Sequence, residues 1–119
     1  MTTQELFNKY QIPQKFEADT MIDRRSGRTV KMLDIGCDTI RPYVTSQHWT
    51  PDGKSFIVAD NDHGILYQYN VEDETLRSLD ILDKGIAWDS GFAVVTPKNV
   101  MFYIKSLSQI WKMDLNTYE

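Results

Sequence analysis

The sequence predicts an all-β fold, namely a partial β-propeller of about two to three blades of antiparallel strands with a short N-terminal helix or arm. The main observation is an internal repeat, in which Thr50-Pro51-Asp52-Gly53 and Thr96-Pro97-Lys98-Asn99 each precede two short apolar strands joined by a polar turn. The offset is 46 residues from Thr50 to Thr96 and 44 residues from Tyr67 to Trp111. A period in the mid-forties is typical of propeller blades. Because a propeller closes with about 4–8 blades, the 119 residues are expected to form only part of a ring.

Composition describes a globular, acidic chain. Apolar residues make up 41% and charged residues 25%, with a net charge of −4 and a pI near 5.1. This balance argues against a nucleic-acid partner. The basic cluster lies among turn residues and predicts a solvated hairpin; its members are Arg24, Arg25, Arg28 and Lys31.

Nothing in the sequence predicts a disulfide framework, a secretory signal or a membrane span. Cys37 is the sole cysteine, so it has no partner within the chain and is expected to be buried as a small apolar residue. The first residues lack a basic segment followed by an apolar one. No run approaches the roughly 18 apolar residues of a spanning helix. We therefore expect a cytoplasmic protein without a membrane partner.

The expected division is an N-terminal arm or short helix over residues 1–14 and propeller blades over 15–119. Thr2 and Glu5 have the spacing of a capping box. Leu6, Phe7 and Tyr10 then share one side of a helix that ends before Pro13. Such a helix is placed to cover one face of the ring.

Residues 15–22 and 28–33 alternate in polarity and predict two strands joined by a turn at 23–27. Gly27 suits a hairpin position that requires positive φ. This segment is therefore expected to form a two-stranded ribbon.

The next segments predict one full blade and three strands of another. A strand over 40–49 leads into a type I turn at Thr50–Gly53, a hairpin of 54–59 with 64–71, and an outer strand at 75–79. Strands at 91–95, 100–104 and 110–115 follow. A sheet cut there has an open edge, which invites self-association. A fragment of a longer protein, a truncated gene and a ring closed by several copies all fit, and we favour the fragment because the last strand lacks charges that would blunt an edge.

Several motifs carry a family resemblance. Trp49-Thr50-Pro51-Asp52-Gly53-Lys54, followed by Leu66-Tyr67 and Asn70, resembles TolB/WD40-like propeller repeats. A narrower resemblance, to the N-terminal blades of oligogalacturonate lyases, rests on Asp23-x-x-x-Gly27-x-x-Val30-x-x-Leu33, the turn at Thr50, Gly91-Phe92 before Phe102-Tyr103-Ile104-Lys105, and Lys112-Met113-Asp114-Leu115-x-Thr117. The ulvan lyases come second.

The lyase resemblance implies a cytoplasmic seven-bladed propeller that acts in pectin degradation by cleaving pectic oligosaccharides through β-elimination. The family's His-Arg pair falls on Ile40 and Arg41, so the arginine matches and the histidine does not. Arg41 is thus the candidate for binding a substrate carboxylate. The family's manganese-binding His and Gln residues lie in later blades, so the resemblance implies no metal or other cofactor in this segment and manganese in the full-length protein. The chain alone is then expected to be inactive.

Three further side chains are candidates for chemistry. The reactive groups of a propeller are expected at the mouth of the central channel, which includes the turns between second and third strands. His63 lies in such a turn, and histidine suits proton transfer, although a solvated turn residue is the plainer interpretation. Tyr43, on the same side of its strand as Arg41, fits sugar stacking, proton donation or core packing. His48 fits a core or channel-lining position.

Two other patterns are not expected to carry chemistry: one resembles part of a calcium-binding loop, and the other predicts packing. Asp60-Asn61-Asp62-His63-Gly64 superficially suggests calcium but lacks the later Glu. Aromatic side chains at strand spacing predict inter-blade packing; they are Phe56, Tyr67, Tyr69, Phe92, Phe102, Tyr103 and Trp111.

Two main hypotheses follow. The first is the N-terminal part of a carbohydrate lyase with an oligosaccharide substrate. The alternative is a non-catalytic TolB-like module for protein or glycan binding. A short chain that closes a ring by self-assembly is a third.

Overall fold

The computed structural model describes residues 2–36, 39–40, 48–60, 62–79, 93–106 and 109–119. Cys37, Arg41, Tyr43 and Phe92 lie outside this part of the chain. The elements in chain order are α1 (Thr3–Tyr10), β1 (Gln14–Lys15), β2 (Asp19–Ile22), β3 (Thr29–Met32), β4 (Thr39–Ile40), β5 (Ser55–Asp60), β6 (Ile65–Asn70), β7 (Thr75–Ser78), β8 (Ala93–Val95), β9 (Val100–Ser106) and β10 (Gln109–Asp114).

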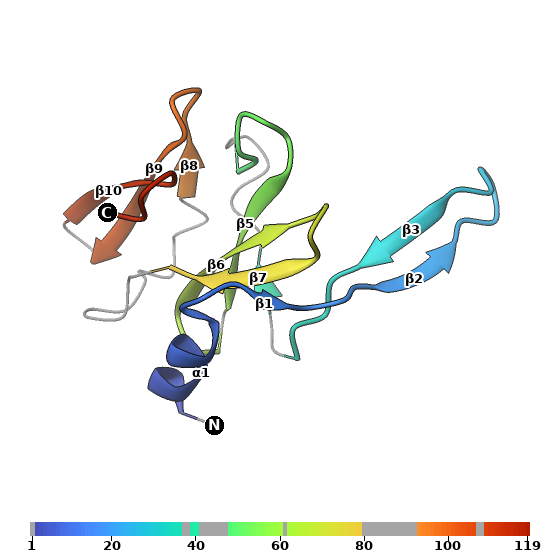
Figure 1. Ribbon diagram of the computed structural model, residues 1–119, viewed down its shortest axis with the longest axis horizontal. Helices are drawn as coiled ribbons and strands as arrows, with labels where there is room; N and C mark the ends of the chain where they lie inside the picture. Colours follow the sequence, from blue (N-terminus) through green and yellow to red (C-terminus); the bar gives the residue numbers. More distant parts are fainter. Residues whose placement is uncertain (1, 37–38, 41–47, 61, 80–92, 107–108) are drawn as a thin grey trace.

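The strands form two antiparallel sheets and a separate hairpin (Figure 1). The first sheet has the order β1-β7-β6-β5-β4, and the second has the order β10-β9-β8. Strands β2 and β3 pair only with each other. This arrangement confirms the predicted all-β, propeller-like fold of incomplete blades with one short helix.

Helix α1 begins at the predicted capping box. The Thr2 hydroxyl accepts a hydrogen bond from the Glu5 backbone N–H at 3.2 Å, and the Glu5 carboxylate accepts one from the Thr2 backbone N–H at 2.7 Å. These contacts satisfy two N–H groups that the first turn would otherwise leave free. The helix then buries Phe7 and Tyr10 against the first sheet.

The two tight turns before β5 and β9 are structurally equivalent. The Gly53 N–H donates to the Thr50 carbonyl at 2.9 Å with φ +71° at Gly53. The Asn99 N–H donates to the Thr96 carbonyl at 2.9 Å with φ +59° at Asn99. Glycine and asparagine are the residues that adopt this left-handed conformation most readily. The predicted repeat is therefore a repeat of backbone geometry.

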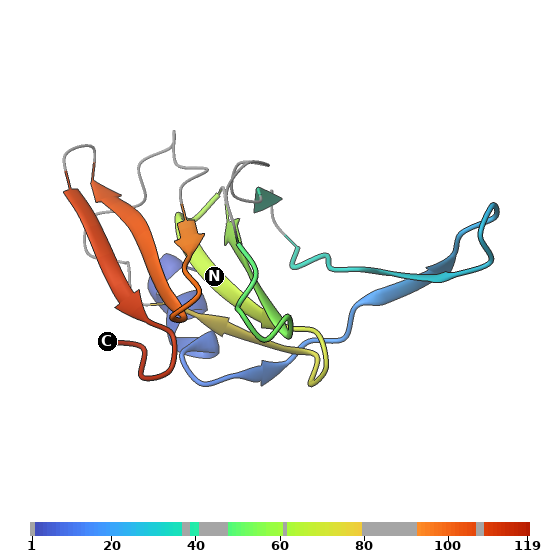
Figure 2. The ribbon, with the colours of Figure 1, turned by 90° about the horizontal axis from the view of Figure 1, so that it is seen from above.

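Each sheet has two faces, which we name by their order along the chain. The forward face of the first sheet carries Ile57, Ala59 and Leu66, and its rear face carries Val58, Ile65, Tyr67, Tyr69 and Leu76. The rear face of the second sheet carries Ala93, Val95, Met101, Tyr103 and Met113, and its forward face carries Val94, Phe102, Ile104, Ile110 and Lys112. The forward face of the first sheet packs against the rear face of the second (Figure 2), and α1 covers the rear face of the first.

The N-terminal strand prediction was wrong in one respect. Residues 15–22 were expected to form one strand of a ribbon, but the structure divides them between β1 and β2. The Phe16 N–H donates to the Glu74 carbonyl at 2.7 Å, and Tyr69 Oη donates to the Phe16 carbonyl at 3.0 Å. These long-range bonds attach β1 to the edge of β7 and leave only β2 to pair with β3.

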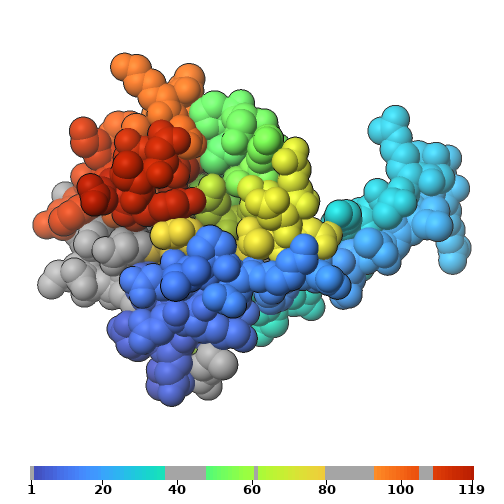
Figure 3. All heavy atoms as spheres, viewed as in Figure 1, coloured from blue at the N-terminus to red at the C-terminus, as the bar shows by residue number. Residues whose placement is uncertain are grey.

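The β2–β3 hairpin projects from the body of the molecule (Figure 3). All eight residues of its two strands are exposed. Gly27 has φ +69° in the connecting turn, as predicted. The ribbon prediction is thus confirmed for β2 and β3.

The predicted inter-blade packing of aromatic residues is confirmed for Tyr103, which is buried between the two sheets. Tyr67 and Tyr69 are also buried, but they pack with α1 on the rear face of the first sheet and not between blades. Phe102 and Trp111 remain 42% and 44% exposed. Among the described residues, no helix has the length and apolar character needed to cross a membrane.

Candidate functional site

The candidate site lies in the turn between β5 and β6, where the chain reverses at Asp60 and His63. The backbone makes this turn because the Gly64 N–H donates to the Asp60 carbonyl at 2.9 Å and Gly64 has φ +69°. Leu79, just after β7, donates its N–H to the Leu66 carbonyl at 2.9 Å, so the turn and the last residues of β7 lie at the same end of the sheet. The sequence predicts the reactive groups of a propeller at this end.

Asp60 and His63 form a close pair. Asp60 Oδ2 lies 2.8 Å from His63 Nδ1. Asp60 Oδ1 accepts hydrogen bonds from the backbone N–H groups of Asp62 at 2.8 Å and His63 at 3.0 Å. The Asp60 side chain is 1% exposed and the His63 side chain is 28% exposed. His63 is therefore a held, half-buried imidazole and not the freely solvated turn residue of the plainer interpretation.

A cavity of about 250 Å³ opens beside this pair. Helix α1 supplies Leu6 and Tyr10 to its wall, and Tyr10 meets the Tyr67 ring edge-on at 5.9 Å between centroids. The remaining lining residues are Ile35, Gly36, Asp60, His63, Tyr67 and Leu76. The wall is thus mostly apolar, with the carboxylate–imidazole pair as its main polar feature.

The arrangement suits proton transfer by His63. A carboxylate that binds Nδ1 fixes the ring orientation and favours a proton on that nitrogen, which leaves Nε2 to exchange protons with a ligand. Sequence reasoning selected His63 but missed Asp60 as its partner. The signal was present, since an aspartate at the end of a strand with histidine three residues later has the spacing of a side-chain-to-backbone turn.

The other candidates do not join this site in the described part of the chain. Arg41 and Tyr43 lie outside the described residues. His48 is partly buried, and its carbonyl accepts a hydrogen bond from the Ile57 N–H at 2.9 Å. That hydrogen bond places the His48 backbone beside β5, on the side opposite to β6.

A metal ion does not fit the described residues. Within them, no group of three His, Cys, Asp or Glu side chains is close enough to hold one. Asp60 already accepts from two N–H groups and contacts the imidazole. The Asp-x-Asp-x-Gly spacing therefore forms a turn and offers no cation cage.

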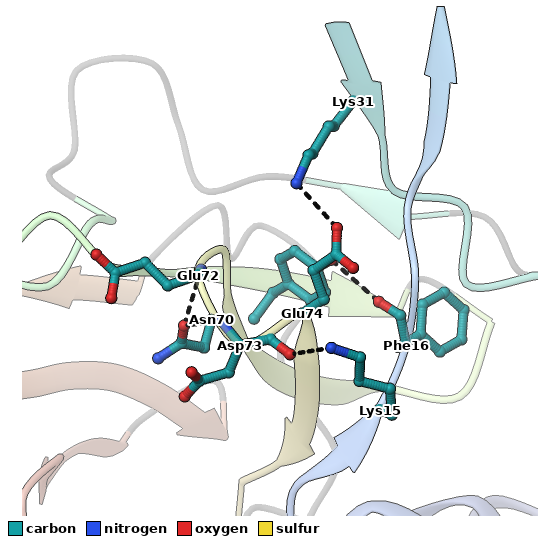
Figure 4. A network of polar contacts seen from close by, with 8 residues as sticks. Lys15, Phe16, Lys31, Asn70, Glu72, Asp73 and Glu74 are labelled. Carbon is teal, nitrogen blue, oxygen red and sulfur yellow. Dashed lines mark hydrogen bonds and ion pairs between the residues drawn. The ribbon is translucent and has the colours of Figure 1, made fainter.

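A second polar cluster holds the base of the β2–β3 hairpin (Figure 4). Lys31 Nζ lies 2.9 Å from Glu74 Oε1, and Lys15 Nζ donates to the Asp73 carbonyl at 2.8 Å. The hydrogen bond and the charge of Glu74 raise the pKa of Lys31, while the hydrogen bond from Lys31 lowers the pKa of Glu74. Burial, and then the charge of Glu74, raises the pKa of Tyr69. This cluster ties β1 and the base of the hairpin to the turn between β6 and β7.

No protein-family model matches the chain, and the comparison with curated proteins finds no match. Two solved structures have a similar fold with a TM-score of 0.72 each: an oligogalacturonate lyase from Vibrio parahaemolyticus at 19% identity, and an oligogalacturonate lyase in complex with manganese at 17% identity. Each match covers 92% of this chain but only 29% of the other. The chain therefore has the fold of about three tenths of an oligogalacturonate lyase structure.

Proposed function

We propose that this chain is the N-terminal part of a β-propeller carbohydrate lyase of the cytoplasm that cleaves uronate-containing, pectic oligosaccharides by β-elimination. The observation that carries the proposal is the fold match over 92% of the chain to two oligogalacturonate lyases. The sequence motifs that resemble this family extend from Asp23 to Thr117. Residues outside this chain would then complete the ring.

β-Elimination on a uronate needs three contributions. A cation neutralises the carboxylate, a base removes the proton from the carbon next to it, and an acid assists the departing glycosidic oxygen. In this proposal Arg41 binds a substrate carboxylate through its two-pronged guanidinium. His63, held by Asp60, exchanges a proton at Nε2, and Tyr43 is the second proton-transfer candidate.

A divalent metal belongs to the proposal only at the level of the whole protein. One of the two similar lyases is in complex with manganese. The described residues here contain no three-ligand group that would hold it. The metal would therefore be bound by blades other than these.

The deciding experiment is an elimination assay on the natural gene product that contains this chain. The protein is incubated with trigalacturonate and manganese, and the unsaturated uronate product is followed by its ultraviolet absorbance. We expect product from the natural gene product and none from residues 1–119 alone. Binding of the oligosaccharide without any unsaturated product would instead support the non-catalytic, glycan-binding propeller module.

Substitutions at the pair test its part in the reaction. His63→Gln keeps a polar side chain but removes the titrating group, so turnover is expected to fall by about 10²–10⁴-fold. Asp60→Asn leaves His63 in place but removes the carboxylate that holds Nδ1, so turnover is expected to fall in this variant as well. Asp19→Asn, an exposed change on the hairpin, is the control. Full activity of His63→Gln would remove His63 from the mechanism while leaving the lyase proposal intact.

A further inference from the structure

Another cavity, of about 220 Å³, lies where α1, β7 and the turn after β10 meet. Helix α1 supplies Phe7 and Gln11 to its wall, whereas the cavity beside His63 uses the neighbouring row of Leu6 and Tyr10. The remaining lining residues are Arg77, Ser78, Leu79 and Tyr118. The two cavities share no lining residue, so they are separate sites.

Arg77 brings a positive charge to this cavity. Its guanidinium carbon lies 3.6 Å from the centroid of the Tyr118 ring. Among the described residues, no carboxylate forms an ion pair with it. Stacking on a ring occupies the face of a guanidinium and leaves the N–H donors in its plane available. The half-buried Arg77 therefore carries a charge that this part of the chain does not neutralise.

The internal repeat supplies a comparison for this contact. Asn70 and Asp114 are equivalent, because each ends its strand and pairs with the first residue of the strand before it. Each is followed by a turn in which the fourth residue has a positive φ, namely Glu74 at +53° and Tyr118 at +63°. Glu74 and Tyr118 therefore occupy the same place in the two sheets.

These two equivalent residues contact a cation in different ways. Glu74 neutralises Lys31, with 2.9 Å between Oε1 and Nζ. Tyr118 contacts Arg77 through an uncharged aromatic ring. The second turn thus holds its cation in place without neutralising it, and this arrangement suits the binding of an anion from outside.

Further hydrogen-bond donors lie at the same cavity. The Leu79 N–H is directed at β6, where it donates to the Leu66 carbonyl. Because the N–H direction alternates along an antiparallel strand, the Ser78 N–H points away from β6, to the edge of β7 beyond the end of its pairing with β1. Gln11 adds a side-chain amide. The cavity therefore combines a guanidinium, a backbone N–H and an amide.

We infer that this cavity is a binding site for a small oxyanion, a carboxylate or a phosphate group, held by the edge of the Arg77 guanidinium. A guanidinium binds either group through two parallel hydrogen bonds. The apolar walls of Phe7 and Leu79 limit the access of water and so strengthen the attraction. The cavity is smaller than the roughly 300–1,000 Å³ of typical ligand pockets, so it suits one sugar acid or one anionic group of a larger molecule. The inference requires no catalytic role for this chain.

Calorimetric titration of the natural gene product with galacturonate, inorganic phosphate and neutral galactose tests this inference. We expect at least one of the two anions to bind saturably, at a site that added salt weakens and that Arg77→Gln weakens at least tenfold. Binding of galacturonate alone would identify a sugar acid as the ligand, and binding of phosphate alone would identify a phosphorylated one. Arg24→Gln, which removes the same charge from an exposed position in the hairpin turn, is the control and should leave the affinity unchanged.

Three results would overturn the inference. They are binding of neither anion, an affinity that Arg77→Gln leaves unchanged, and binding of galactose as tight as that of galacturonate. Anion binding at this site in a protein without elimination activity would keep the inference and reject the lyase.

Substitutions at Tyr118 test the same site without altering Arg77. Tyr118→Phe keeps the aromatic ring and is expected to keep the affinity for the anion. Tyr118→Leu removes the ring and is expected to weaken binding several-fold, because the guanidinium is no longer held. Equal affinities in these two variants would contradict a site built on the stacked guanidinium.

Discussion

Asp60 stabilises the β5–β6 turn through one buried carboxylate. Its oxygens accept hydrogen bonds from two backbone N–H groups and contact the imidazole of His63, at distances of 2.8 to 3.0 Å. Asp60→Ala leaves these donors without an acceptor in a site that is 1% exposed, so we expect a loss of about 2–4 kcal/mol in the free energy of unfolding. Urea unfolding of the chain measures it.

Asp60→Asn is the matched comparison, because its amide oxygen still accepts a hydrogen bond. Its cost is expected to be about 1–2 kcal/mol, below that of Asp60→Ala. Equal costs for the two variants would mean that the turn does not depend on these hydrogen bonds. His63→Ala should cost less than Asp60→Ala, since Asp60 still accepts hydrogen bonds from the two backbone N–H groups.

At the candidate site, the sequence predicted a role for His63 but not the burial of Asp60. His63 was identifiable because histidine in a turn at the end of a strand is a plain sequence feature. The burial of Asp60 was not, because it depends on α1 lying over the rear face of the sheet. Leu6 and Tyr10 reach the cavity from fifty or more positions earlier in the chain, and no local pattern encodes that contact.

At the scale of elements, the N-terminus of α1 depends on the capping box. Thr2→Ala removes the acceptor for the Glu5 N–H, and the expected loss is about 1 kcal/mol. Loss of the cap acts on α1 itself, which lies over Leu76 and Tyr67. Amide exchange is therefore expected to quicken first in α1, and in β5 and β6 only when α1 no longer covers them. Thr3→Ala, one position further along, is the control, since the N-cap is Thr2 and not Thr3. Unchanged exchange in α1 with Thr2→Ala would contradict the role of the box.

The β2–β3 hairpin is tied to the first sheet by a pH-dependent contact. The pKa of Glu74 is lowered from 4.5 and that of Lys31 is raised from 10.5. A lowered carboxyl pKa contributes stability above pH 4.5 that is lost as pH falls through the folded value. A raised lysine pKa contributes below pH 10.5 and is lost as pH rises through the folded value. The contact is therefore expected to be fully formed between these limits.

NMR titration of the Glu74 carboxyl checks this contact directly. In Lys31→Ala the Glu74 pKa should rise toward 4.5, because the hydrogen bond from Lys31, which is the main reason that this pKa is lowered, is removed. Lys54→Ala is the control, because Lys54 pairs with Glu72 rather than Glu74, at 3.4 Å between Nζ and Oε2. An unchanged Glu74 pKa in Lys31→Ala would show that the hairpin base is not held by this pair.

The strands themselves were predictable to different degrees. β5, β6, β7, β9 and β10 follow local alternation and tight turns, so their positions could be predicted within one or two residues. β1 could not, because Gln14–Lys15 forms a strand only by pairing with β7, sixty residues later. Local alternation in residues 15–22 gave no sign that the bonds of Phe16 to the β6–β7 region would interrupt it.

At the scale of the whole molecule, one sheet carries two cores. Its forward face meets the second sheet, and its rear face meets α1. The repeat predicted the number of sheets, because each unit of the sequence corresponds to one. It did not predict that α1 would pack on the rear face of the first sheet, since helix amphipathicity defines an apolar side but not the surface that receives it.

The two sheets are expected to depend on each other for stability. In the part of the chain that the structure describes, the second sheet has three strands, and its buried face packs on the first sheet. A sheet must bury its apolar face against another layer, so the second sheet should not persist without the first. Met101→Ala, at a site that is 0% exposed in the shared core, is therefore expected to cost about 2–5 kcal/mol and to quicken amide exchange in β5 and β9 together.

Leu76→Ala is the matched variant for the other core, because Leu76 is 1% exposed beneath α1. It removes a similar volume, yet it should first quicken exchange in α1 and β7. If Met101→Ala instead loosened β8, β9 and β10 and left β5 protected, the two sheets would be separate cooperative units. Their packing would then not be what stabilises the first sheet, and α1 alone would account for the stability of β5 and β6.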